Sequence, residues 1–365
     1  MMLLPTRTTL QVSDVAVDLT AASITIGRLD QRLQNHPLKE AFLYRARLDA
    51  VRAQAQVDGQ AIDPWHLAAV LEGLRLPTQD LEGADRFALV EAAQTAFRLY
   101  QWQTHPSATQ RHEIARALSH LRPFIRPCGP LLGAASAFHD WLHQGGQRAP
   151  FRAALGVLWR KRGVMRSALP LTGPAALRAG APHDPVRWVP VFLRAVTAEA
   201  HSMTEMLRGM ERQWVMARRE AGAQRRHSRA PAAIDILAAR PLTSATTLAD
   251  LLKMSVNAAL DLLERFESRG FVVEVTHRSA RRLFALRGFE PLREALMPPR
   301  RLASYPLEDT DPALPDELRP SDLVSTLSEQ QAAMWKPDFT ELEAAMREAD
   351  HILRKTTSRR NKLRL

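Results

Sequence analysis

The sequence predicts a mainly α protein, in which a helical bundle is followed by a small C-terminal domain and a helical tail. Apolar residues recur at three- and four-residue spacing from about Leu29 to about Ala230, the pattern of successive amphipathic helices. Aromatic residues make up only 6% of the chain, and proline and glycine stand mostly at the edges of these periodic stretches. Between Pro231 and Leu286 the pattern becomes three short helices followed by two strands.

The order of these patterns predicts five regions. Residues 219–231 are small and basic without an apolar stripe, which is typical of a hinge between domains. The stretch after Leu286 is rich in proline and acidic residues, which predicts an extended linker. We therefore expect an N-terminal extension at 1–28, a helical domain at 29–229, a three-helix and two-strand domain at 230–290, a linker at 291–337, and a C-terminal helix with a basic tail at 338–365.

Local signals fix several helix starts in the first domain. Asp63 precedes Pro64 and Asp184 precedes Pro185, so each aspartate can cap a helix whose first residue needs no N–H. The segment after Pro185 carries Trp188, Phe192, Val196, Met203, Met206 and Met210 near helical spacing, which predicts a long helix. The proline- and glycine-rich run from Gly163 to Asp184 predicts an exposed connection within the bundle.

Composition narrows the class of function. The formal net charge of +11 suggests a polyanionic partner such as nucleic acid, although a surplus made mostly of arginine also follows from a GC-rich coding sequence. Cys128 is the only cysteine, which excludes an intrachain disulfide and a cysteine-based zinc site. The N-terminus lacks a signal-peptide pattern and no stretch approaches eighteen apolar residues. We expect a cytoplasmic protein with no membrane segment, no metal and no cofactor.

The three-helix pattern begins after Pro231. Its first helix places Ile234, Leu237 and Ala238 inward and stops at Pro241. Thr246 or Thr247 is expected to cap the second helix, with Asp250 following in the first turn. The inner face of the second helix is predicted to consist of Leu248, Leu251 and Leu252.

The third helix is bounded by two signals. Ser255 is placed to accept hydrogen bonds from its free N–H groups, and Gly270 is placed to end it in the left-handed conformation. The expected buried stripe is Val256, Ala259, Leu260, Leu263 and Phe266. The expected outward face is Asn257, Ala258, Asp261, Glu264 and Arg265.

Two strand patterns follow, at 271–276 and 283–286, and the hairpin tip between them is basic. Three helices followed by such a hairpin are typical of a winged helix-turn-helix, whose third helix enters the major groove of DNA. Asn257 is the best candidate to read a base, while arginines of the hairpin would meet phosphate or the minor groove. The predicted contacts with double-stranded DNA are Thr247, Lys253, Ser255, Asn257, Ala258, Asp261, Arg265, His277, Arg278, Arg281 and Arg282.

Charge within this domain is almost balanced. Residues 231–290 hold eight Lys and Arg against seven Asp and Glu, so the domain alone would bind the phosphate backbone weakly. The segments 111–166 and 205–230 are more basic and could contribute. A homodimer formed through the bundle is the other expected source of affinity.

The segment from Ala153 to Leu286 resembles the last helices and the C-terminal winged domain of Fic-type proteins. ALGVLWRKRGV is similar to the helix after the Fic catalytic loop, and DPVRWVPVFLRAV is similar to the next helix. TLADLLKMSVNAALDLLERFESRGFVVEVT resembles the appended DNA-binding segment. The whole chain is also similar to an uncharacterised family, often plasmid-borne in rhizobia, with a C-terminal helix-turn-helix. These resemblances imply a Fic-like helical domain and a transcriptional or plasmid-associated regulator.

Fic adenylyltransferases require HPFxDGNGR, and the corresponding stretch at 139–147 reads HDWLHQGGQ. His139 is kept, but His143 stands at the metal carboxylate and Gln147 at the phosphate-binding arginine, so no catalytic residue is assigned. A divergent nucleotide transferase remains an alternative. So does a metal hydrolase, because His139 and His143 are four residues apart and would share a helix face. A third alternative is a protein-interaction module that does not bind DNA.

Overall fold

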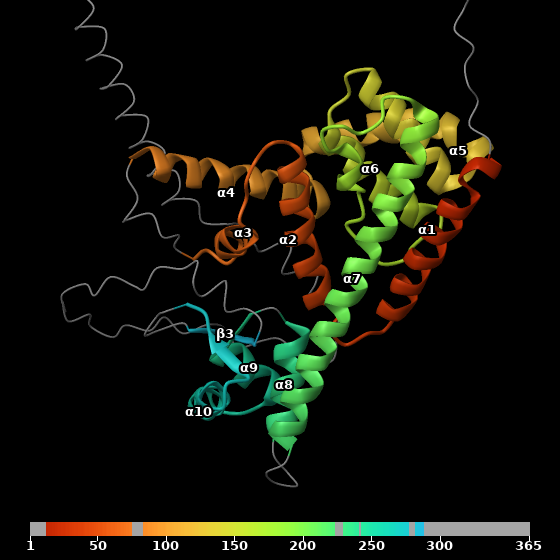
Figure 1. The fold of residues 1–365 in the computed structure, drawn as a ribbon. Coiled ribbons are helices and arrows are strands. Elements are labelled where there is room, and N and C mark those ends of the chain that lie inside the picture. Colours follow the sequence, from red (N-terminus) through yellow and green to blue (C-terminus); the bar gives the residue numbers. More distant parts are fainter. Residues whose placement is uncertain (1–11, 75–82, 223–228, 241, 277–281, 288–365) are drawn as a thin grey trace, which may run out of the picture.

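The computed structural model of the protein describes residues 12–74, 83–222, 229–240, 242–276 and 282–287. Within these residues the fold is mainly helical, as the sequence predicts (Figure 1). The α-helices are α1 Val12–Leu33, α2 Lys39–Val57, α3 Pro64–Leu71, α4 Gly83–Gln103, α5 Ala108–His143, α6 Arg148–Lys161, α7 Pro185–Gly222, α8 Ala230–Ala239, α9 Ala245–Leu252 and α10 Val256–Ser268. The other elements are the 3-10 helix η1 Pro174–Leu177 and the strands β1 Thr243–Ser244, β2 Val272–Glu274 and β3 Leu283–Leu286.

An aromatic cluster lies at the centre of the first core, where α5, α6 and α7 meet. Phe138 and Phe151 stack with ring centroids 4.5 Å apart, and Phe192 packs edge-on against Phe138 at 5.8 Å. All three side chains are fully buried. Trp188 continues the stack on Phe192 and donates its indole N–H to the carbonyl of Ala176, so the indole is buried without losing a hydrogen bond.

Helix α5 has an interruption that the sequence explains. It starts with a reciprocal capping box between Ser107 and Gln110. Gly129 then adopts φ 75° and ψ 176°, which no helix contains, between two of the three prolines that lie inside this element. At Gly133 the chain lies close to the backbone before the bend. A Cβ at this position would lie 2.5 Å from the Phe124 carbonyl oxygen. Glycine is therefore required after the bend.

Helix α1 belongs to the bundle and not to a separate extension. It begins at Val12 and runs past the boundary expected between residues 28 and 29. Ala22 and Ile26 are fully buried in the same core as Leu29. Apolar residues at this end follow helical spacing, but the polar residues between them interrupt the apolar pattern. The start of the bundle was therefore predicted at residue 29, which is too late.

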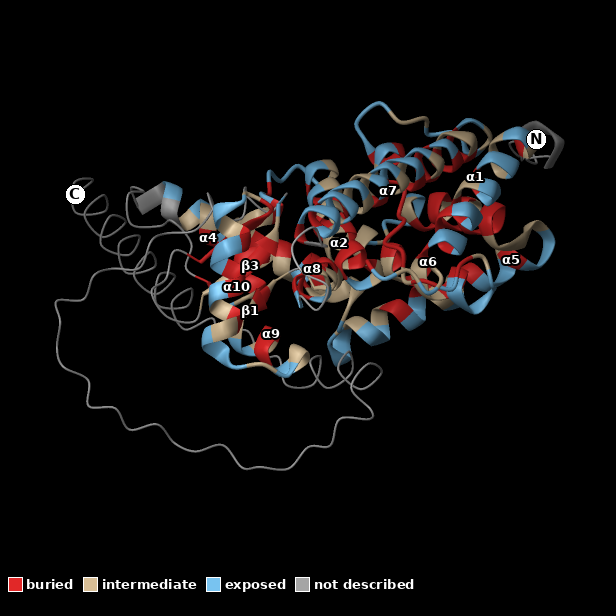
Figure 2. Cartoon of the chain, turned by 90° about the horizontal axis from the view of Figure 1, so that it is seen from below, coloured by how far each residue is buried: buried red, intermediate tan, exposed pale blue. Residues whose placement is uncertain are grey.

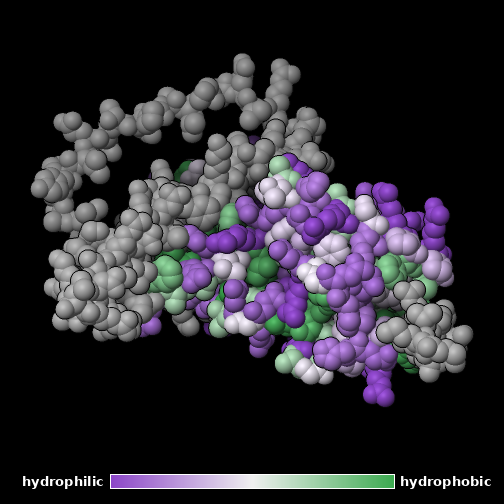
Figure 3. All heavy atoms as spheres, turned by 90° about the horizontal axis from the view of Figure 1, so that it is seen from above, coloured by the Kyte–Doolittle hydropathy of each residue, from purple (hydrophilic) through white to green (hydrophobic). Residues whose placement is uncertain are grey.

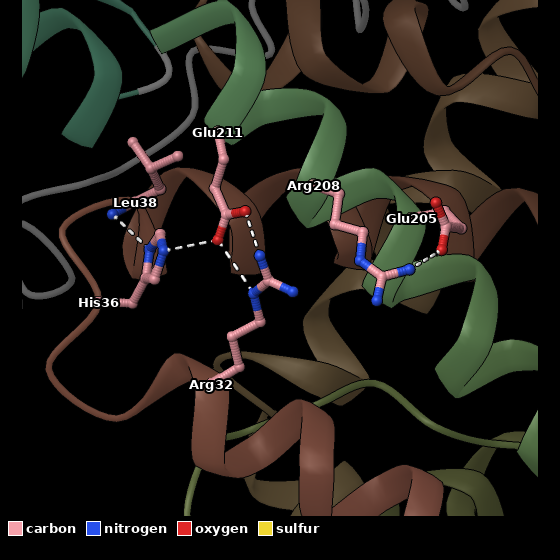
Figure 4. Close-up of polar contacts among 6 residues, drawn as sticks. All are labelled: Arg32, His36, Leu38, Glu205, Arg208 and Glu211. Carbon is pink, nitrogen blue, oxygen red and sulfur yellow. Dashed lines mark hydrogen bonds and ion pairs between the residues drawn. The ribbon is translucent and has the colours of Figure 1, made fainter. Parts of the chain in front are cut away.

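The connection between α1 and α2 is bound to α7 through one carboxylate, that of Glu211 (Figure 4). Glu211 accepts hydrogen bonds from both the Nε and the terminal amino group of Arg32, and it contacts the His36 Nε2 at 2.9 Å. The other His36 ring nitrogen lies 3.1 Å from the backbone N–H of Leu38, which precedes α2. Glu211 of α7 therefore binds both the end of α1 and the connection that leads to α2.

Helix α7 is the longest of the described elements and joins two cores. Its predicted inward residues are confirmed, because Trp188, Phe192, Val196 and Met203 are buried and Met206 and Met210 pack against the first core. The helix then continues to Gly222, several residues into the hinge expected at 219–231. Its last turns bring Trp214, Ala217 and Ala221 into a separate apolar core with α8 and α10.

The elements around this separate core form what we call the C-terminal module, which comprises residues 229–240, 242–276 and 282–287. It consists of α8, α9, α10 and a three-stranded antiparallel sheet in the order β1-β3-β2. Strand β1 has only two residues and was not predicted. Val275 and Ala285 join the apolar cluster of α2, α3 and α4, so the module contacts the bundle through its sheet as well as through α7.

The distribution of buried residues agrees with this arrangement. Figure 2 shows buried residues on β1 and β3 and on the inward sides of the helices, with exposed residues outside. The face in Figure 3 is largely hydrophilic where it is coloured, and apolar residues occur there in small groups. No helix among the described residues is long and apolar enough to cross a membrane. The expected linker at 291–337 and the helix and tail at 338–365 lie outside the described residues.

Candidate nucleic-acid interface

The turn between α9 and α10 sets the position of the predicted DNA-contacting helix. Lys253 ends α9 with φ 52° and ψ 56°, a left-handed conformation that reverses the chain. Two residues later the extended Ser255 caps α10, and its Oγ accepts a hydrogen bond from the Ala258 N–H at 3.2 Å. The cap predicted at Ser255 is confirmed. Gly270, at φ 75°, closes the other end as predicted.

Most of the outward face predicted for α10 is exposed. Asn257, Asp261, Glu264 and Arg265 are accessible, and Ala258 is half-buried. Ser255 and Lys253 are also exposed. The first turn of α10 therefore presents a serine, an asparagine and a small residue to solvent, and side chains of this size allow a helix to approach another surface closely.

The buried stripe of α10 differs from the prediction at three positions. Ala259, Leu263 and Phe266 are buried as expected. Val256 is 46% exposed and Leu260 is half-buried, while Leu262 is buried instead. Val256 has the right spacing but lies in the first turn, next to the exposed cap. The core therefore lies against the middle of the helix.

The cap of α9 was predicted two or three residues too late. Ser244, not Thr246 or Thr247, is the capping residue, and its Oγ accepts a hydrogen bond from the Thr247 N–H at 3.1 Å. Ser244 ends β1 in the extended conformation that a cap requires. The predicted DNA-contacting side chain of Thr247 is half-buried, with its hydroxyl 2.9 Å from that of Ser244. On the inner face of α9, Leu248 is buried, whereas the predicted Leu251 and Leu252 are only half-buried.

Arg229 fixes the same turn from outside and was missed by sequence reasoning. One of its terminal nitrogens donates to the carbonyls of Leu252 and Lys253, each at 2.6 Å. These carbonyls belong to the C-terminal end of α9, which attracts positive charge. The only sequence signal was an arginine just before the first helix of the module, within a basic run that predicts a hinge.

Arg282 connects the hairpin to α10. Its guanidinium donates to Glu264 at 2.7 Å and to Glu267 at 3.1 Å, and its central carbon lies 4.9 Å from the ring centroid of Phe284. The guanidinium therefore pairs with two of the acids on α10 and offsets one of their two charges. For the predicted contact with phosphate, the Arg282 guanidinium would have to bind the phosphate as well as these two carboxylates. His277, Arg278 and Arg281 lie outside the described residues.

The acid on the N-terminal half of α10 remains exposed. Asp261 has no ion-pair partner among the described residues, and its backbone carbonyl accepts a hydrogen bond from the Nε of Arg265 at 3.1 Å. With Lys253 and Arg265 nearby, the surface around Asn257 is mixed in charge.

The basic segments expected to assist lie in different places. Helices α5 and α6, which contain most of residues 111–166, lie at the end of the molecule away from α9 and α10 (Figure 1). The end of α7 lies beside the module, and Arg212 and Arg219 are exposed on it. Arg218 is paired with Asp235 of α8 at 3.3 Å. Within one chain, α7 is the basic segment near α10.

The HDWLHQGGQ stretch at 139–147 forms the last turn of α5 and a tight connection to α6. The His139 and His143 rings stack with centroids 4.0 Å apart. The His139 Nε2 lies 2.8 Å from the carbonyl oxygen of His183. Burial lowers the pKa of His139, and the proximity of His143 lowers it further. The described residues contain no group of three or more His, Cys, Asp or Glu that could hold a metal.

Gly146 in this stretch has a packing role. A Cβ built on it would lie 2.3 Å from the Nε1 of Trp141, and this indole donates to the Gln147 carbonyl at 2.7 Å. A glycine is thus needed at this position because the Trp141 indole leaves no room for a side chain.

No protein-family model matches this chain, and no curated protein matches it either.

Proposed function

We propose that this chain binds double-stranded DNA through a winged helix-turn-helix formed by the C-terminal module. The observation that carries the proposal is the order α8, β1, α9, α10, β2, β3 with a sheet of order β1-β3-β2. This order places a hairpin beside the helix that follows the tight turn. The resemblance to Fic-type proteins and to the plasmid-borne family agrees with such an appended domain and with a regulatory role.

In this proposal α10 is the helix that enters the major groove. Its first turn carries the exposed Ser255, Asn257 and the half-buried Ala258, and no large side chain other than Val256 prevents approach. An asparagine side chain can donate and accept together, as the edge of an adenine requires. Asn257 is therefore the proposed base-reading residue, and Lys253 is placed for a phosphate at the turn.

The near balance of charge implies that affinity depends on more than one module. A homodimer would double the number of contacts with the DNA and would require two half-sites related by symmetry. The exposed arginines at the end of α7 would add contacts with the backbone. In this proposal the protein is a dimeric regulator in the cytoplasm, and no catalytic residue is assigned to it.

The proposal is tested by selecting bound fragments from random duplex DNA with the full-length protein. Fluorescence anisotropy on the selected sequence then gives the affinity at several salt concentrations. Asn257→Ala should weaken binding to that sequence by about 5- to 150-fold while leaving the salt slope unchanged, since a base contact is worth about 1–3 kcal/mol. Gln31→Ala, an exposed amide on α1, is the matched control.

Two results would refute the proposal. Absence of binding to any duplex at low salt would remove the DNA partner and leave the alternative of a protein-interaction module. Binding that is unchanged by Asn257→Ala, with a salt slope that falls on substitution of exposed arginines on α5, would move the contact to the other end of the molecule.

A further inference from the structure

The outward face of helix α1 carries the most exposed large apolar side chain among the described residues. Val17 is 83% exposed and Ile24 is 46% exposed. These two residues are seven apart, about two turns of a helix, so they lie on the same side of α1. They point away from Ala22 and Ile26, which are fully buried against the rest of the bundle. Figure 1 shows α1 at the outer edge of the bundle, beside α7.

The polar groups on this face already have hydrogen-bond partners inside the helix. The hydroxyls of Thr20 and Ser23 each donate to the carbonyl four residues earlier, at 2.7 and 2.8 Å. A hydroxyl bonded in this way can be covered without losing its hydrogen bond. The only charged residue from Val17 to Gly27 is Asp18, which is half-buried and paired with Arg194 of α7 at 2.7 Å. The exposed side of this stretch is therefore uncharged.

Gly27 on the same face is not explained by the packing of its own chain. A Cβ built on Gly27 meets no atom within 4 Å. Glycine inside a helix is less favourable than alanine, so a glycine with open space around it costs stability and gains nothing within the chain. A glycine on the surface of a helix allows a second helix to approach closely. A helix packed on this face would account for Gly27.

The spacing of the residues indicates which helix fits. Val17 and Ile24 stand at the first position of a seven-residue repeat, and Thr20 and Gly27 stand at the fourth. β-Branched residues at the first position favour two helices paired in parallel. In a symmetric parallel pair each residue meets its own copy, and an uncharged face then meets no like charge. A second copy of this chain therefore fits the face.

The direction of α1 agrees with a parallel pair. Helix α1 runs beside α7 in the same direction, because Asp18 pairs with Arg194 and Arg32 pairs with Glu211. The end of α1 therefore lies toward the C-terminal module, which packs on α7 from Trp214 onward. Two copies paired in parallel through α1 would place both modules at the same end of the dimer. Two half-sites on one DNA duplex require this arrangement.

The other neighbouring exposed apolar residues in the described part of the chain fit a second copy less well. Val215 and Met216 are exposed on α7, and the exposed Arg212 and Arg219 flank them. A parallel pair of α7 helices would bring each arginine toward its own copy. An antiparallel pair centred on Val215 and Met216 would bring Arg212 toward Arg219 of the other copy. Like charges brought together in this way oppose association.

We propose that this chain forms a parallel homodimer, related by a two-fold axis, through the face of α1 that consists of Val17, Thr20, Ala21, Ile24 and Gly27. This face would form the dimer that the proposed function requires. The parallel direction rests in part on that function, whereas the pairing itself does not require DNA. One helix from each copy buries less than about 1,200 Å² in total, a size found in weak and reversible complexes.

Sedimentation equilibrium of the full-length protein without DNA measures the pairing, at concentrations up to about 100 μM. We expect a reversible dimer. Val17→Glu should weaken the dimer at least about 10-fold, because the two new carboxylates would face each other. Its melting temperature at low protein concentration should stay close to that of the wild type, because the Val17 side chain is mostly exposed. Val215→Glu is the matched control and should leave the dissociation constant unchanged.

A second variant tests the close approach at Gly27. Gly27→Leu should not lower the melting temperature at low protein concentration, because a Cβ at this position meets no atom of its own chain and leucine is the better helix former. The same substitution should weaken the dimer at least about 10-fold, because the added side chain would hold the two helices apart. Loss of pairing without loss of folding is the expected combination.

Disulfide formation between copies tests the direction of the pair. Cys128 is the only cysteine and is first replaced by serine. In that background Val17→Cys and Ile24→Cys, made separately, should each give a disulfide-linked dimer on mild oxidation. A parallel pair brings both positions to their own copies, within the short Cα separation that a disulfide requires. An antiparallel pair could do so at one of these positions at most.

Three results would contradict the proposal. A protein that stays monomeric over the whole concentration range would leave this face to the chain before Val12 or to a different protein. A dimer that Val17→Glu leaves unchanged would form elsewhere, and loss of pairing in Val215→Glu would place it on α7. Linkage through only one of the two cysteine positions would exclude the parallel pair. Because no DNA is present, these results are independent of whether α10 binds DNA.

Discussion

Replacement of Glu199 by glutamine tests the electrostatics of the bundle. Glu199 projects from α7 and accepts hydrogen bonds from the backbone N–H groups of Thr172 and Gly173, at 2.8 and 2.9 Å. Burial raises the pKa of Glu199 to about 7, although these two hydrogen bonds and Arg152 act in the opposite direction. The wild-type protein therefore folds with this group partly protonated near neutral pH.

The sign of the effect follows from the raised pKa. A carboxyl group whose folded pKa exceeds its unfolded pKa contributes stability that is fully present below the unfolded pKa, at about 4.5, and is lost as the pH rises through about 7. Between pH 6 and pH 8 this loss amounts to about 1 kcal/mol for a shift of this size. Because part of the residue still reaches solvent, this figure is an upper value.

Glutamine keeps an acceptor for both N–H groups and removes the titration. We therefore expect Glu199→Gln to gain up to about 1 kcal/mol relative to wild type when the pH rises from 6 to 8. Urea unfolding followed by tryptophan fluorescence at pH 6, 7 and 8 measures this difference. Glu220→Gln, at the exposed end of the same helix, is the control. A difference between Glu199→Gln and wild type that stays constant across these pH values would refute the raised pKa.

Two further substitutions test the packing and capping assignments, each by the urea midpoint. Gly146→Ala should destabilise the protein by about 1–3 kcal/mol, because the added methyl would overlap the Trp141 ring; Gly209→Ala, whose methyl would meet only the end of Arg212, should be neutral or stabilising, and equal effects would contradict the steric argument. Ser255→Ala should cost about 1 kcal/mol through loss of the cap of α10, and Ser255→Asp should restore it. An unchanged midpoint for Ser255→Ala would show that the cap contributes nothing to stability.

Features set by neighbouring residues were predictable. Ser255 and Gly270 were placed correctly because a cap and a left-handed end depend on the chain within a few residues. The long helix after Pro185 was predicted because its apolar residues repeat at helical spacing over several turns. The mainly helical class follows from the same pattern.

Features set by distant segments were not predictable. Strand β1 has two residues, too few for any pattern, and it exists because β3 pairs with it. The exposure of Val256 depends on where the rest of the module ends, which spacing along one helix does not reveal. Arg47 of α2 and Arg152 of α6 line the same cavity, and nothing in either segment alone indicates that they lie close together.

The continuous helix α7 governs how this protein can be divided. With 38 residues it is about 57 Å long at 1.5 Å per residue, and its final turns form one wall of the core of the C-terminal module. A fragment cut at the boundary between 229 and 230 would lose Trp214, Ala217 and Ala221 and would expose the apolar side chains of α8 that they cover. A fragment meant to retain the module should therefore start within α7, before Trp214. Because α7 is one continuous helix, a displacement of the bundle would be transmitted to the module along α7 and not through a hinge.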